Sequence, residues 1–527
     1  MGSECQIHYT SGTQAVSITP SFYNLGALTP PDRDRDKVAI IDLGTNHERR
    51  FSYRDFEGEA NAVARALAAY GLARGDRVAI LSANRFEYLT ALHGIMRAGF
   101  VAVPVNYRFP AATIDYIVRD AGARLVFCDG VRFASAPKDL PRIRFDGEGS
   151  EFADFLKPGP FAPVIPANGE PALFLYTSGS TGRPKGVVLS HQSHIWVVEQ
   201  RMAAQEVSRH RFLIAAPLYH MNALALSQLA HAAHATVVLL PQFTALDYLK
   251  AIEDYRCTWL TAVPPMIAMM LNERERLAAT DLSSVEHLRM GSAPISQSLM
   301  EAIHHALPKT AVTNAYGTTE AGPVVFGPHP EGLPQPEMSV GYPHPKVELR
   351  LIGDDGKPTD LGMLEMKSPA IMNGYHNRPD VPSPITVDGF YVTGDVFRRD
   401  ENGFHFFVGR TDDMFVSGGE NIFPGEVEKM LETHPDVVQA CVVPVDDDIK
   451  GTKPVAFVVK REGSRLDAGG LKAFALENAP AYQHPRSIWF MDALPLASTN
   501  KLDRKILRDM AAERLRPGSA SGANVRD

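Results

Sequence analysis

Short apolar runs that fit β-strands alternate with helix-like segments along the first half of the 527-residue chain. The segment 60–70 has apolar residues at helical spacing and stops at Gly71, the run 77–81 fits a strand, and a second helical segment ends at Gly99. The same alternation continues through 101–105, 124–128, 172–177, 187–200, 235–240 and 246–255. Strands separated by helices of ten or more residues favour largely parallel sheets. The sequence therefore predicts an α/β fold.

The composition changes near residue 410, and this change predicts a boundary between two domains. The stretch 409–424 is rich in Gly, Asp and Asn, as expected of a loop or hinge. Beyond it, short strand-like and helix-like runs indicate a compact α+β unit, at 426–433, 437–445, 455–459 and 471–477. We expect a large N-terminal domain of mixed and parallel sheets with flanking helices over 1–410, and a small mobile α+β lid domain over 411–527. The tail 517–527 is rich in Ser, Gly and Ala and is expected to fray.

The charge balance argues against a general attraction to nucleic acids or to anionic membrane surfaces. With 53 Lys and Arg against 61 Asp and Glu, the formal net charge is −8, so any bound anion must be held by local groups. The four cysteines are far apart and form neither a CxxC pair nor a zinc spacing. No signal-peptide pattern and no apolar run of ~18 residues are visible. These features predict a cytoplasmic protein with reduced thiols.

The segment 175–191, LYTSGSTGRPKGVVLSH, has the character of a phosphate-binding loop. An apolar strand leads into small residues whose backbone N–H groups and hydroxyls can surround an anion, and Lys185 adds a mobile cation. These small residues are Thr177, Ser178, Gly179, Ser180, Thr181 and Gly182. The spacing matches neither a Walker A loop nor GxGxxG, and no GxSxG elbow is present. A nicotinamide dehydrogenase and a serine hydrolase therefore lose their main support.

This segment closely resembles the corresponding loop of the adenylate-forming superfamily, which includes acyl-CoA synthetases, luciferases and peptide-synthetase adenylation domains. The resemblance extends from about Phe51 to Arg508, and several independent motifs follow in the family's order. In that family the loop closes over the β- and γ-phosphates of ATP. The resemblance therefore implies that ATP is a substrate.

The second motif is NAYGTTE at 314–320. Tyr316 offers a flat face for a purine, Thr319 a hydroxyl for a phosphate oxygen, and Glu320 a carboxylate suited to Mg²⁺. By resemblance these are their roles. The resemblance also assigns to the nucleotide site Asn314, Ala315, Gly317 and Thr318, and, in the loop under adenine, Ser292, Ala293 and Pro294.

A third motif, YVTGD at 391–395 followed by Gly409 and Arg410, supplies groups for the ribose. Asp395 can accept hydrogen bonds from both ribose hydroxyls, and Arg410 can pair with a ribose or phosphate oxygen. In the family they do so, and Asp412 occupies the pivot about which the C-terminal domain rotates between two working faces.

The fourth motif is a late lysine, Lys501, in the segment NKLDR at 500–504. The resemblance implies that this lysine reaches the carboxylate and the α-phosphate during adenylation. Attack of a carboxylate on phosphorus brings two anions together, and a cation stabilises the resulting charge. Asn500 stands where glycine is usual in the family, as it does in several aryl-CoA ligases.

The expected acceptor of the acyl group is the thiol of coenzyme A. Too few residues follow Arg508 to form a carrier domain. The loop 417–421 resembles the glycine loop that lines the pantetheine tunnel of CoA ligases, where Gly418 and Gly419 permit a close approach. Tyr482 and Arg486 lie where related ligases contact the CoA nucleotide, and His484 replaces the arginine expected between them.

The segment PLYH at 217–220 is expected to border the acid. By resemblance to 4-chlorobenzoate- and feruloyl-type ligases, His220 gates the path of the carboxylate. The same resemblance lines the acid pocket with Met221, Asn222, Gly291, Ala315 and Gly317. These residues are small or neutral, with no obvious cation for a second carboxylate. A flat aromatic monocarboxylate such as ferulate or p-coumarate is therefore expected, with Asn222 as a partner for a ring hydroxyl. A benzoate or a medium-chain fatty acid could use the same walls.

The motifs together predict an ATP-dependent acid–CoA ligase that uses Mg²⁺. Acid and ATP would give acyl-AMP and pyrophosphate, the lid would rotate, and the CoA thiol would displace AMP. The alternative is a non-catalytic regulator that binds acyl-adenylates; retention of Glu320, Asp395, Arg410 and Lys501 argues against it. The expected partners are small molecules, without nucleic acid or a membrane span, and a homodimer is left open.

Overall fold

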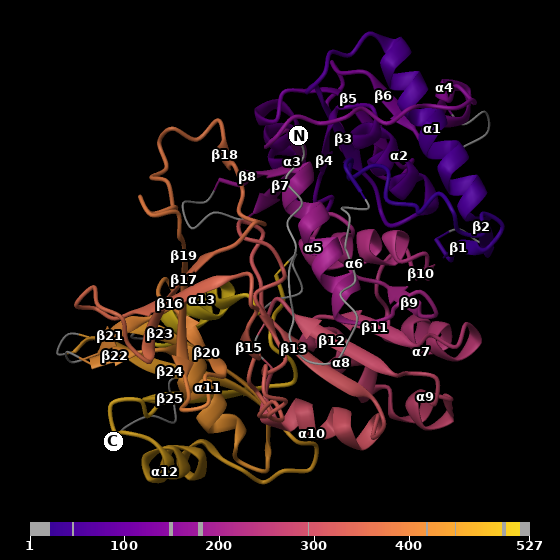
Figure 1. The fold of residues 1–527 in the computed structure, drawn as a ribbon. Helices are drawn as coiled ribbons and strands as arrows, with labels where there is room; N and C mark the ends of the chain where they lie inside the picture. Colours follow the sequence, from indigo (N-terminus) through magenta and orange to yellow (C-terminus); the bar gives the residue numbers. More distant parts are fainter. Residues whose placement is uncertain are drawn as a thin grey trace.

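The computed structural model describes residues 22–44, 47–146, 151–177, 183–293, 295–417, 420–447, 450–497 and 502–516. The first half of the chain forms the indigo and magenta part of Figure 1, and the orange and yellow C-terminal elements gather beside it. None of the described helices combines the length and the apolar content that crossing a lipid bilayer requires.

The first large sheet carries most of the parallel pairing. Its strands are β1 (Val38–Asp42), β2 (Arg49–Ser52), β9 (Arg211–Ile214), β10 (Thr236–Leu239), β11 (Trp259–Ala262), β12 (His287–Gly291) and β13 (Ala311–Ala315). They lie in the order β13-β12-β11-β9-β10-β1-β2. Every pair is parallel except β1 with β2. The carboxyl ends of β9, β11, β12 and β13 therefore meet at one edge.

The second large sheet is parallel at its centre and antiparallel at one side. Its strands are β3 (Arg77–Leu81), β4 (Val101–Pro104), β5 (Ala123–Cys128), β6 (Arg142–Arg144), β7 (Pro171–Thr177), β8 (Lys185–Ser190) and β18 (Gly374–His376). They lie in the order β18-β8-β7-β4-β3-β5-β6. The pairs β7 with β8 and β8 with β18 are antiparallel.

Helices surround these two sheets, and one buried cluster joins both sheets through them. The helical segments are α1 (Tyr53–Tyr70), α2 (Phe86–Arg97), α3 (Ala111–Asp120), η1 (Phe133–Ser135), α4 (Glu151–Phe155), α5 (His191–Ala204), α6 (Met221–Ala232), α7 (Ala245–Asp254), α8 (Pro264–Asn272), α9 (Arg274–Ala279) and α10 (Gln297–Ala306). Helix α1 begins earlier than predicted because Ser52 and Asp55 form a capping box, and it ends at Gly71 in the left-handed conformation. Side chains of α1, α2, α5 and α6 pack with strands of both sheets in the main core.

An antiparallel region follows the two large sheets. It consists of β14 (Phe326–Gly327), β15 (Tyr342–Pro343), β16 (Glu348–Ile352), β17 (Leu361–Lys367), β19 (Tyr391–Arg399) and β20 (His405–Arg410). The last four form a sheet in the order β16-β17-β19-β20. The alternation of strands and helices that predicted parallel sheets stops before this region, which explains the change of pairing. The predicted α/β class, with mixed and parallel sheets and a small C-terminal unit, is confirmed.

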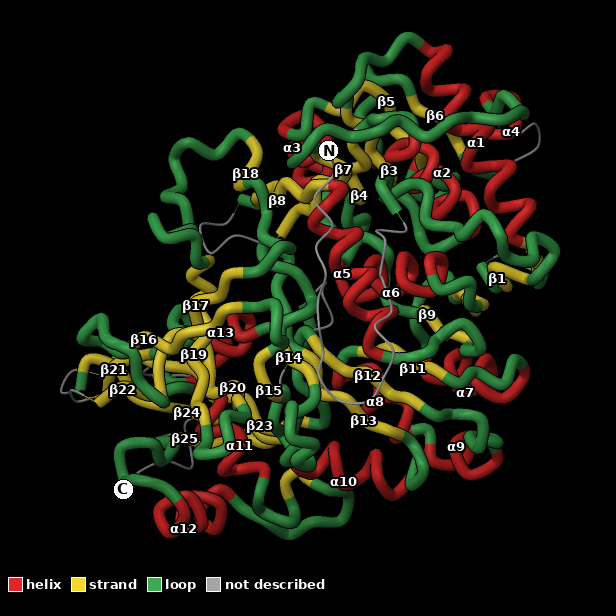
Figure 2. Tube along the Cα trace, in the orientation of Figure 1, coloured by secondary structure: helices red, strands yellow, loops and turns green. Residues whose placement is uncertain are grey.

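The C-terminal unit is an α+β layer whose strands appear in yellow at the lower left of Figure 2. Its elements are β21 (Phe415–Ser417), β22 (Glu420–Ile422), α11 (Pro424–Glu432), β23 (Val437–Asp447), β24 (Gly451–Lys460), α12 (Ala468–Asn478), β25 (Ser487–Met491) and α13 (Arg504–Arg514). The stretch 409–424, predicted as a loop or hinge, contains two short strands, because β21 and β22 pair there and bury Phe415 and Ile422. Lys429 on α11 donates to the carbonyl oxygen of Phe407 at 2.7 Å, across the predicted boundary at residue 410. That boundary and the tail 517–527, which lies outside the described residues, stay predictions.

Candidate active site

The predicted site residues come from the carboxyl ends of parallel strands. Gly291 ends β12, Ala315 ends β13, and the segment 217–220 follows β9. Ligands of open α/β sheets bind outside this edge, because the loops that follow the strands converge there. The structure therefore brings the acid segment and the nucleotide segments to one edge of the first sheet.

The predicted phosphate loop connects two antiparallel strands. Thr177 ends β7, Lys185 begins β8, and the two residues are directly paired. Ser178, Gly179, Ser180, Thr181 and Gly182 lie outside the described residues. The ammonium of Lys185 lies 4.5 Å from the centre of the Tyr375 ring, on the neighbouring strand β18, where a cation–π contact holds it. Lys185 is therefore held by Tyr375, a residue that was not among those predicted.

Glu320 lies close to the same tyrosine. The hydroxyl of Tyr375 donates to Oε1 of Glu320 at 3.1 Å. Burial raises the pKa of Glu320, and the hydrogen bond from Tyr375 and the charges of Lys185 and Arg410 oppose that rise. Within the described ranges Glu320 forms no ion pair. A part-buried carboxylate of this kind fits a hard divalent cation, which would supply the missing positive charge.

The third motif forms a connected cluster around Asp395. The hydroxyl of Tyr316 donates to Oδ2 of Asp395 at 2.5 Å, and Nε of Arg410 lies 3.1 Å from Oδ1. The Tyr316 ring packs edge-on against Phe397 with a centroid distance of 4.8 Å. Because Asp395 is buried, these contacts fix the tyrosine ring and the arginine together. The residues assigned to the purine and to the ribose are therefore in direct contact.

The remaining nucleotide residues differ in what they contact. The amide nitrogen of Asn314 donates to the carbonyl of Met338 at 3.1 Å, and the hydroxyl of Thr318 accepts from the backbone N–H of Ala321 at 3.0 Å. Both side chains therefore brace loops of the protein. Ser292 has a φ of +67°, a left-handed conformation that is uncommon for a residue with a side chain. Thr319 and Ala293 are part-buried beside these residues in sequence, and Pro294 lies outside the described residues.

Gly317 is required by a close backbone approach, so replacing it with alanine should destabilise the protein. A Cβ at this position would lie 2.6 Å from Cα of Pro323 and 2.8 Å from the carbonyl oxygen of Gly322. Both obstacles are backbone atoms, so we expect Gly317→Ala to cost about 1–3 kcal/mol of unfolding free energy. Denaturant unfolding measures this loss. Gly327→Ala is the control, because a Cβ there meets nothing within 4 Å; equal effects of the two substitutions would contradict the steric argument.

The acid segment lies at the start of α6. His220 is the N-cap residue of this helix, its ring lies 4.6 Å from that of Tyr219, and Met221 and Asn222 form the first turn. The Asn222 side-chain oxygen accepts hydrogen bonds from the Thr261 hydroxyl at 3.3 Å and from Nη1 of Arg289 at 3.2 Å. The sequence predicted no cation beside the acid segment, and Arg289 corrects that prediction. Arg289 and Gly291 are two residues apart in β12 and so face the same side, a signal that the sequence contained.

The predicted CoA contacts lie in the C-terminal unit. Tyr482 packs against the core of that unit. His484 is buried, and burial with the nearby charges of Arg486, Lys472 and Lys450 lowers its pKa to about 4. Three cations around a neutral imidazole form a site that an anion would stabilise.

Asp412, the predicted hinge residue, is exposed and follows β20. Gly418, Gly419 and Lys501 lie outside the described residues.

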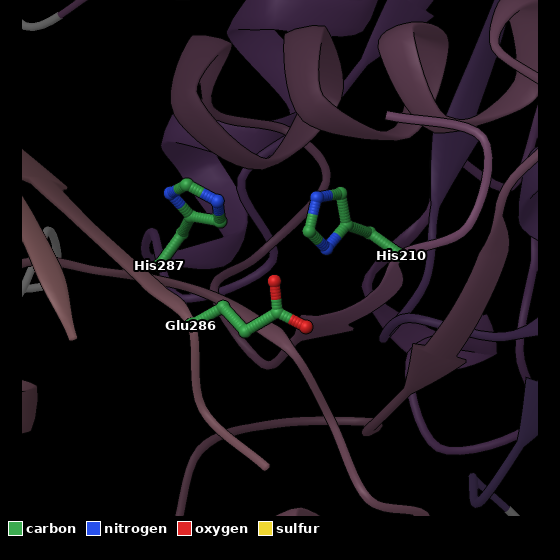
Figure 3. Close-up of side chains that lie close together, drawn as sticks. All are labelled: His210, Glu286 and His287. Carbon is green, nitrogen blue, oxygen red and sulfur yellow. The ribbon is translucent and has the colours of Figure 1, made fainter. Parts of the chain in front are cut away.

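A second group of titratable side chains lies at the opposite ends of the strands. Figure 3 shows His210, Glu286 and His287 facing one another, and their nearest ligand-type atoms all lie within 4.8 Å of each other. His210 precedes β9 and His287 begins β12, so the group is at the amino edge of the sheet. Arg209 donates to both carboxylate oxygens of Glu286, at 2.7 and 2.5 Å. Because the arginine already engages Glu286, we assign this group to a surface ion pair.

Comparison with known proteins agrees with the geometry of the site. The family model described as AMP-binding enzyme matches residues 29–376, and that of the AMP-binding enzyme C-terminal domain matches residues 426–501. The indoleacetate–CoA ligase of Aromatoleum aromaticum is 32% identical over 484 residues, covering 89% of this chain and 94% of that protein. A feruloyl-CoA synthase from an Amycolatopsis species is 33% identical over 468 residues, covering 86% and 92%.

Solved structures of related enzymes also match most of this chain. The ATP-bound structure of MatB from Rhodopseudomonas palustris has a TM-score of 0.84 and 29% identity, covering 94% of this chain and all of that chain. The first matched model spans more than half of the chain, and both curated relatives exceed 30% identity over most of it. The chain belongs to the AMP-binding enzyme family and is an AMP-forming acyl-CoA synthetase of the adenylate-forming superfamily, as its motifs predicted.

Proposed function

We propose that this synthetase activates an aromatic carboxylic acid, most readily a hydroxycinnamate such as ferulate or p-coumarate. The observation that supports a catalytic role is the convergence of Tyr316 and Arg410 on Asp395, with Glu320 and Lys185 nearby. A regulator that only binds acyl-adenylates would not require a part-buried carboxylate suited to a metal. A benzoate or a medium-chain fatty acid is the alternative substrate.

The nucleotide half of the reaction is assigned to six groups. Tyr316 presents its ring to the adenine, and Asp395 with Arg410 holds the ribose, while Lys185 and Thr319 reach phosphate oxygens. Glu320 would hold Mg²⁺, which neutralises phosphate charge when it is bound. The hydrogen bond from Tyr375 keeps the Glu320 carboxylate oriented for that contact.

The acid half is assigned to the segment at the start of α6. His220 borders the path of the reacting carboxylate, and Met221, Asn222, Gly291, Ala315 and Gly317 line the pocket. One of the curated relatives is named for feruloyl-CoA and another for indoleacetate, so the common feature of the two is an aromatic acid. This common feature supports an aromatic substrate here.

The thiol half requires the C-terminal unit. We propose that residues 411–527 form a lid that rotates about Asp412 and presents Lys501 in the first step and the Gly418–Gly419 loop in the second. Tyr482 and Arg486 would then contact the CoA nucleotide, together with the cations around His484. The small-molecule partners are the acid, ATP and CoA; a cytoplasmic location stays a prediction of the sequence, and a homodimer is left open.

The test is AMP release from ATP, Mg²⁺ and CoA with a panel of hydroxycinnamates, benzoates and fatty acids. We expect CoA-dependent AMP release with the aromatic acids, because two curated relatives are named for aromatic acids. Mass spectrometry of the thioester identifies the product. AMP release with fatty acids alone would contradict the assignment of an aromatic substrate. Absence of AMP release with every acid would favour a non-catalytic protein that only binds acyl-adenylates.

A further inference from the structure

Arg289 lies inside the region that the acid segment borders. It stands on β12, where its Nη1 donates to Oδ1 of Asn222 at 3.2 Å and its Nη2 lies 3.4 Å from the carbonyl oxygen of Pro323. The hydroxyl of Thr261, directly paired with Arg289 on the neighbouring strand, donates to the same Asn222 oxygen at 3.3 Å. Because a guanidinium only donates, the amide atom that faces it must be the oxygen.

This arrangement leaves the amide nitrogen of Asn222 without an acceptor. The nitrogen is buried and has no hydrogen-bond partner within the described part of the chain. A buried donor left in this state costs about 1–3 kcal/mol. An acceptor atom supplied by a bound molecule would remove that cost.

The charge of a second part-buried arginine interacts with that of Arg289. Burial and the charge of Arg289 lower the pKa of Arg201, on α5, well below its usual range, and burial lowers the pKa of Arg289 to about 10. No carboxylate of the described residues forms an ion pair with either guanidinium, and none contributes to either shift. Part-buried guanidinium groups that have no carboxylate partner among the described residues favour an anion beside them.

The position of Arg289 shows where on a substrate that anion would lie. The predicted nucleotide loop 292–294 directly follows Gly291, the last residue of β12, and Arg289 is two residues earlier than Gly291 on the same face of the strand. Two residues of a strand span ~7 Å. The Arg289 side chain therefore leaves the strand about that distance from Gly291, on the side away from the nucleotide segments. A group bound there belongs to the far end of the acid.

We propose that the acid activated by this enzyme carries a second anionic group at the end far from its reacting carboxylate, bound by Arg289, Arg201 and the Asn222 amide nitrogen. The inference rests on the aromatic acid–CoA ligase activity proposed above and replaces its hydroxycinnamate with an aromatic acid whose ring bears a carboxylate or a similarly charged group. Two guanidinium groups and an amide N–H can donate to the several oxygens of such a group. A neutral ring hydroxyl would leave both positive charges uncompensated.

The first test compares three acids that differ only at the ring position opposite the side chain: 4-carboxycinnamate, 4-hydroxycinnamate and 4-methylcinnamate. The assay is AMP release by the full chain with ATP, Mg²⁺ and CoA. We expect kcat/KM for the carboxy acid to exceed that for the methyl acid by on the order of 10- to 100-fold, as for hydrogen bonds to charged groups. Equal values, or a preference for the hydroxy or methyl acid, would overturn the inference.

The second test removes the charges one at a time. In Arg289→Gln and in Arg201→Gln the preference for the carboxy acid over the methyl acid should fall about tenfold or more, chiefly through KM. Arg209→Gln is the matched control, because Arg209 pairs with Glu286 at the opposite edge of the sheet; its preference should stay as in the wild type. Thermal unfolding midpoints verify that each variant is folded.

The outcomes separate this inference from the proposed function. Turnover of the methyl or hydroxy acid without a preference for the carboxy acid overturns the second anion and leaves the ligase intact. An equal loss of turnover for all three acids in Arg289→Gln also overturns it, because it would mean a structural role. Absence of AMP with every acid overturns the proposed function itself.

Discussion

Lys501→Ala is expected to slow formation of the acyl-adenylate strongly while leaving the second half-reaction largely intact. The lysine is assigned to the charge that develops when the carboxylate attacks the α-phosphate, and groups of this kind contribute on the order of 10²- to 10³-fold to a rate. The first half-reaction is measured as pyrophosphate release from acid and ATP without CoA. The second is measured as thioester formation from synthetic acyl-AMP and CoA. Only the first should fall by that factor.

Lys505→Ala provides the matched control, because Lys505 is an exposed lysine on α13, four residues further along the chain. It should behave as the wild type in both half-reactions. The reverse pattern is expected for Gly418→Phe, which should block thioester formation and spare adenylation, since a bulky side chain would obstruct the proposed pantetheine path. Gly469→Phe, in the same unit, controls for the added bulk, because a Cβ at Gly469 meets only Asp467 Oδ1, at 3.5 Å. Equal losses of both half-reactions in Lys501→Ala and in Gly418→Phe would refute a lid that works with two faces.

The strands and helices of the first half of the chain could be predicted because their apolar periodicity is local. The run 77–81 coincides with β3, and 246–255 nearly coincides with α7. The hairpin of β21 and β22 was missed, because its Gly, Asp and Asn content masks two strands of three residues each. Strands of three residues are too short to show an alternating apolar pattern, so the surrounding Gly, Asp and Asn residues dominate the segment.

The sequence predicted which residues form the nucleotide site, but not which contacts those residues make with one another. Tyr316 precedes Asp395 by 79 residues, and Arg410 follows it by 15. Only folding brings Tyr316 and Arg410 to the Asp395 carboxylate. Their motif identity placed them in one site, but the hydrogen bond between Tyr316 and Asp395 depends on the packing of β19 against the loop after β13. Tyr375 was missed for the same reason, since its link to Glu320 and Lys185 comes from the pairing of β18 with β8.

The acid pocket was the least predictable part because its far wall comes from a strand interior. The residues carried over from the family follow strand ends, where motifs are recognisable. Arg289 lies within β12 between two fully buried apolar residues, Leu288 and Met290, and reads in the sequence as one charged residue of an amphipathic strand. Its function depends on Asn222 and on Arg201, which come from two different helices. A charged residue two positions before a site glycine is the signal that could have found it.

Glu320→Gln is expected to lower adenylation by on the order of 10²-fold or more, because a divalent cation on the phosphates supplies several kcal/mol of transition-state stabilisation. Glutamine keeps the size and one oxygen of the side chain but removes the negative charge that would hold Mg²⁺. The measurement is pyrophosphate release across a Mg²⁺ titration. The Mg²⁺ concentration that gives half of the maximal rate should rise, and the maximal rate should fall.

Tyr375→Phe should change the same Mg²⁺ titration less strongly than Glu320→Gln does. It removes the hydrogen bond of 3.1 Å to Oε1 of Glu320 and keeps the ring that Lys185 contacts. Loss of one such supporting contact to a metal ligand typically costs 10- to 100-fold in metal affinity, so we expect about this rise in the Mg²⁺ requirement with a smaller loss of maximal rate. Tyr255→Phe is the control, because its hydroxyl bonds to Glu48 far from the site, and it should leave the titration unchanged. Tyr391→Phe is unsuitable as a control, because Tyr391 interacts with the charges of Glu320 and Asp395. If Glu320→Gln kept the wild-type Mg²⁺ dependence, the metal would have to be held by other residues, and the assignment of Glu320 would fail while the nucleotide cluster around Asp395 would stand.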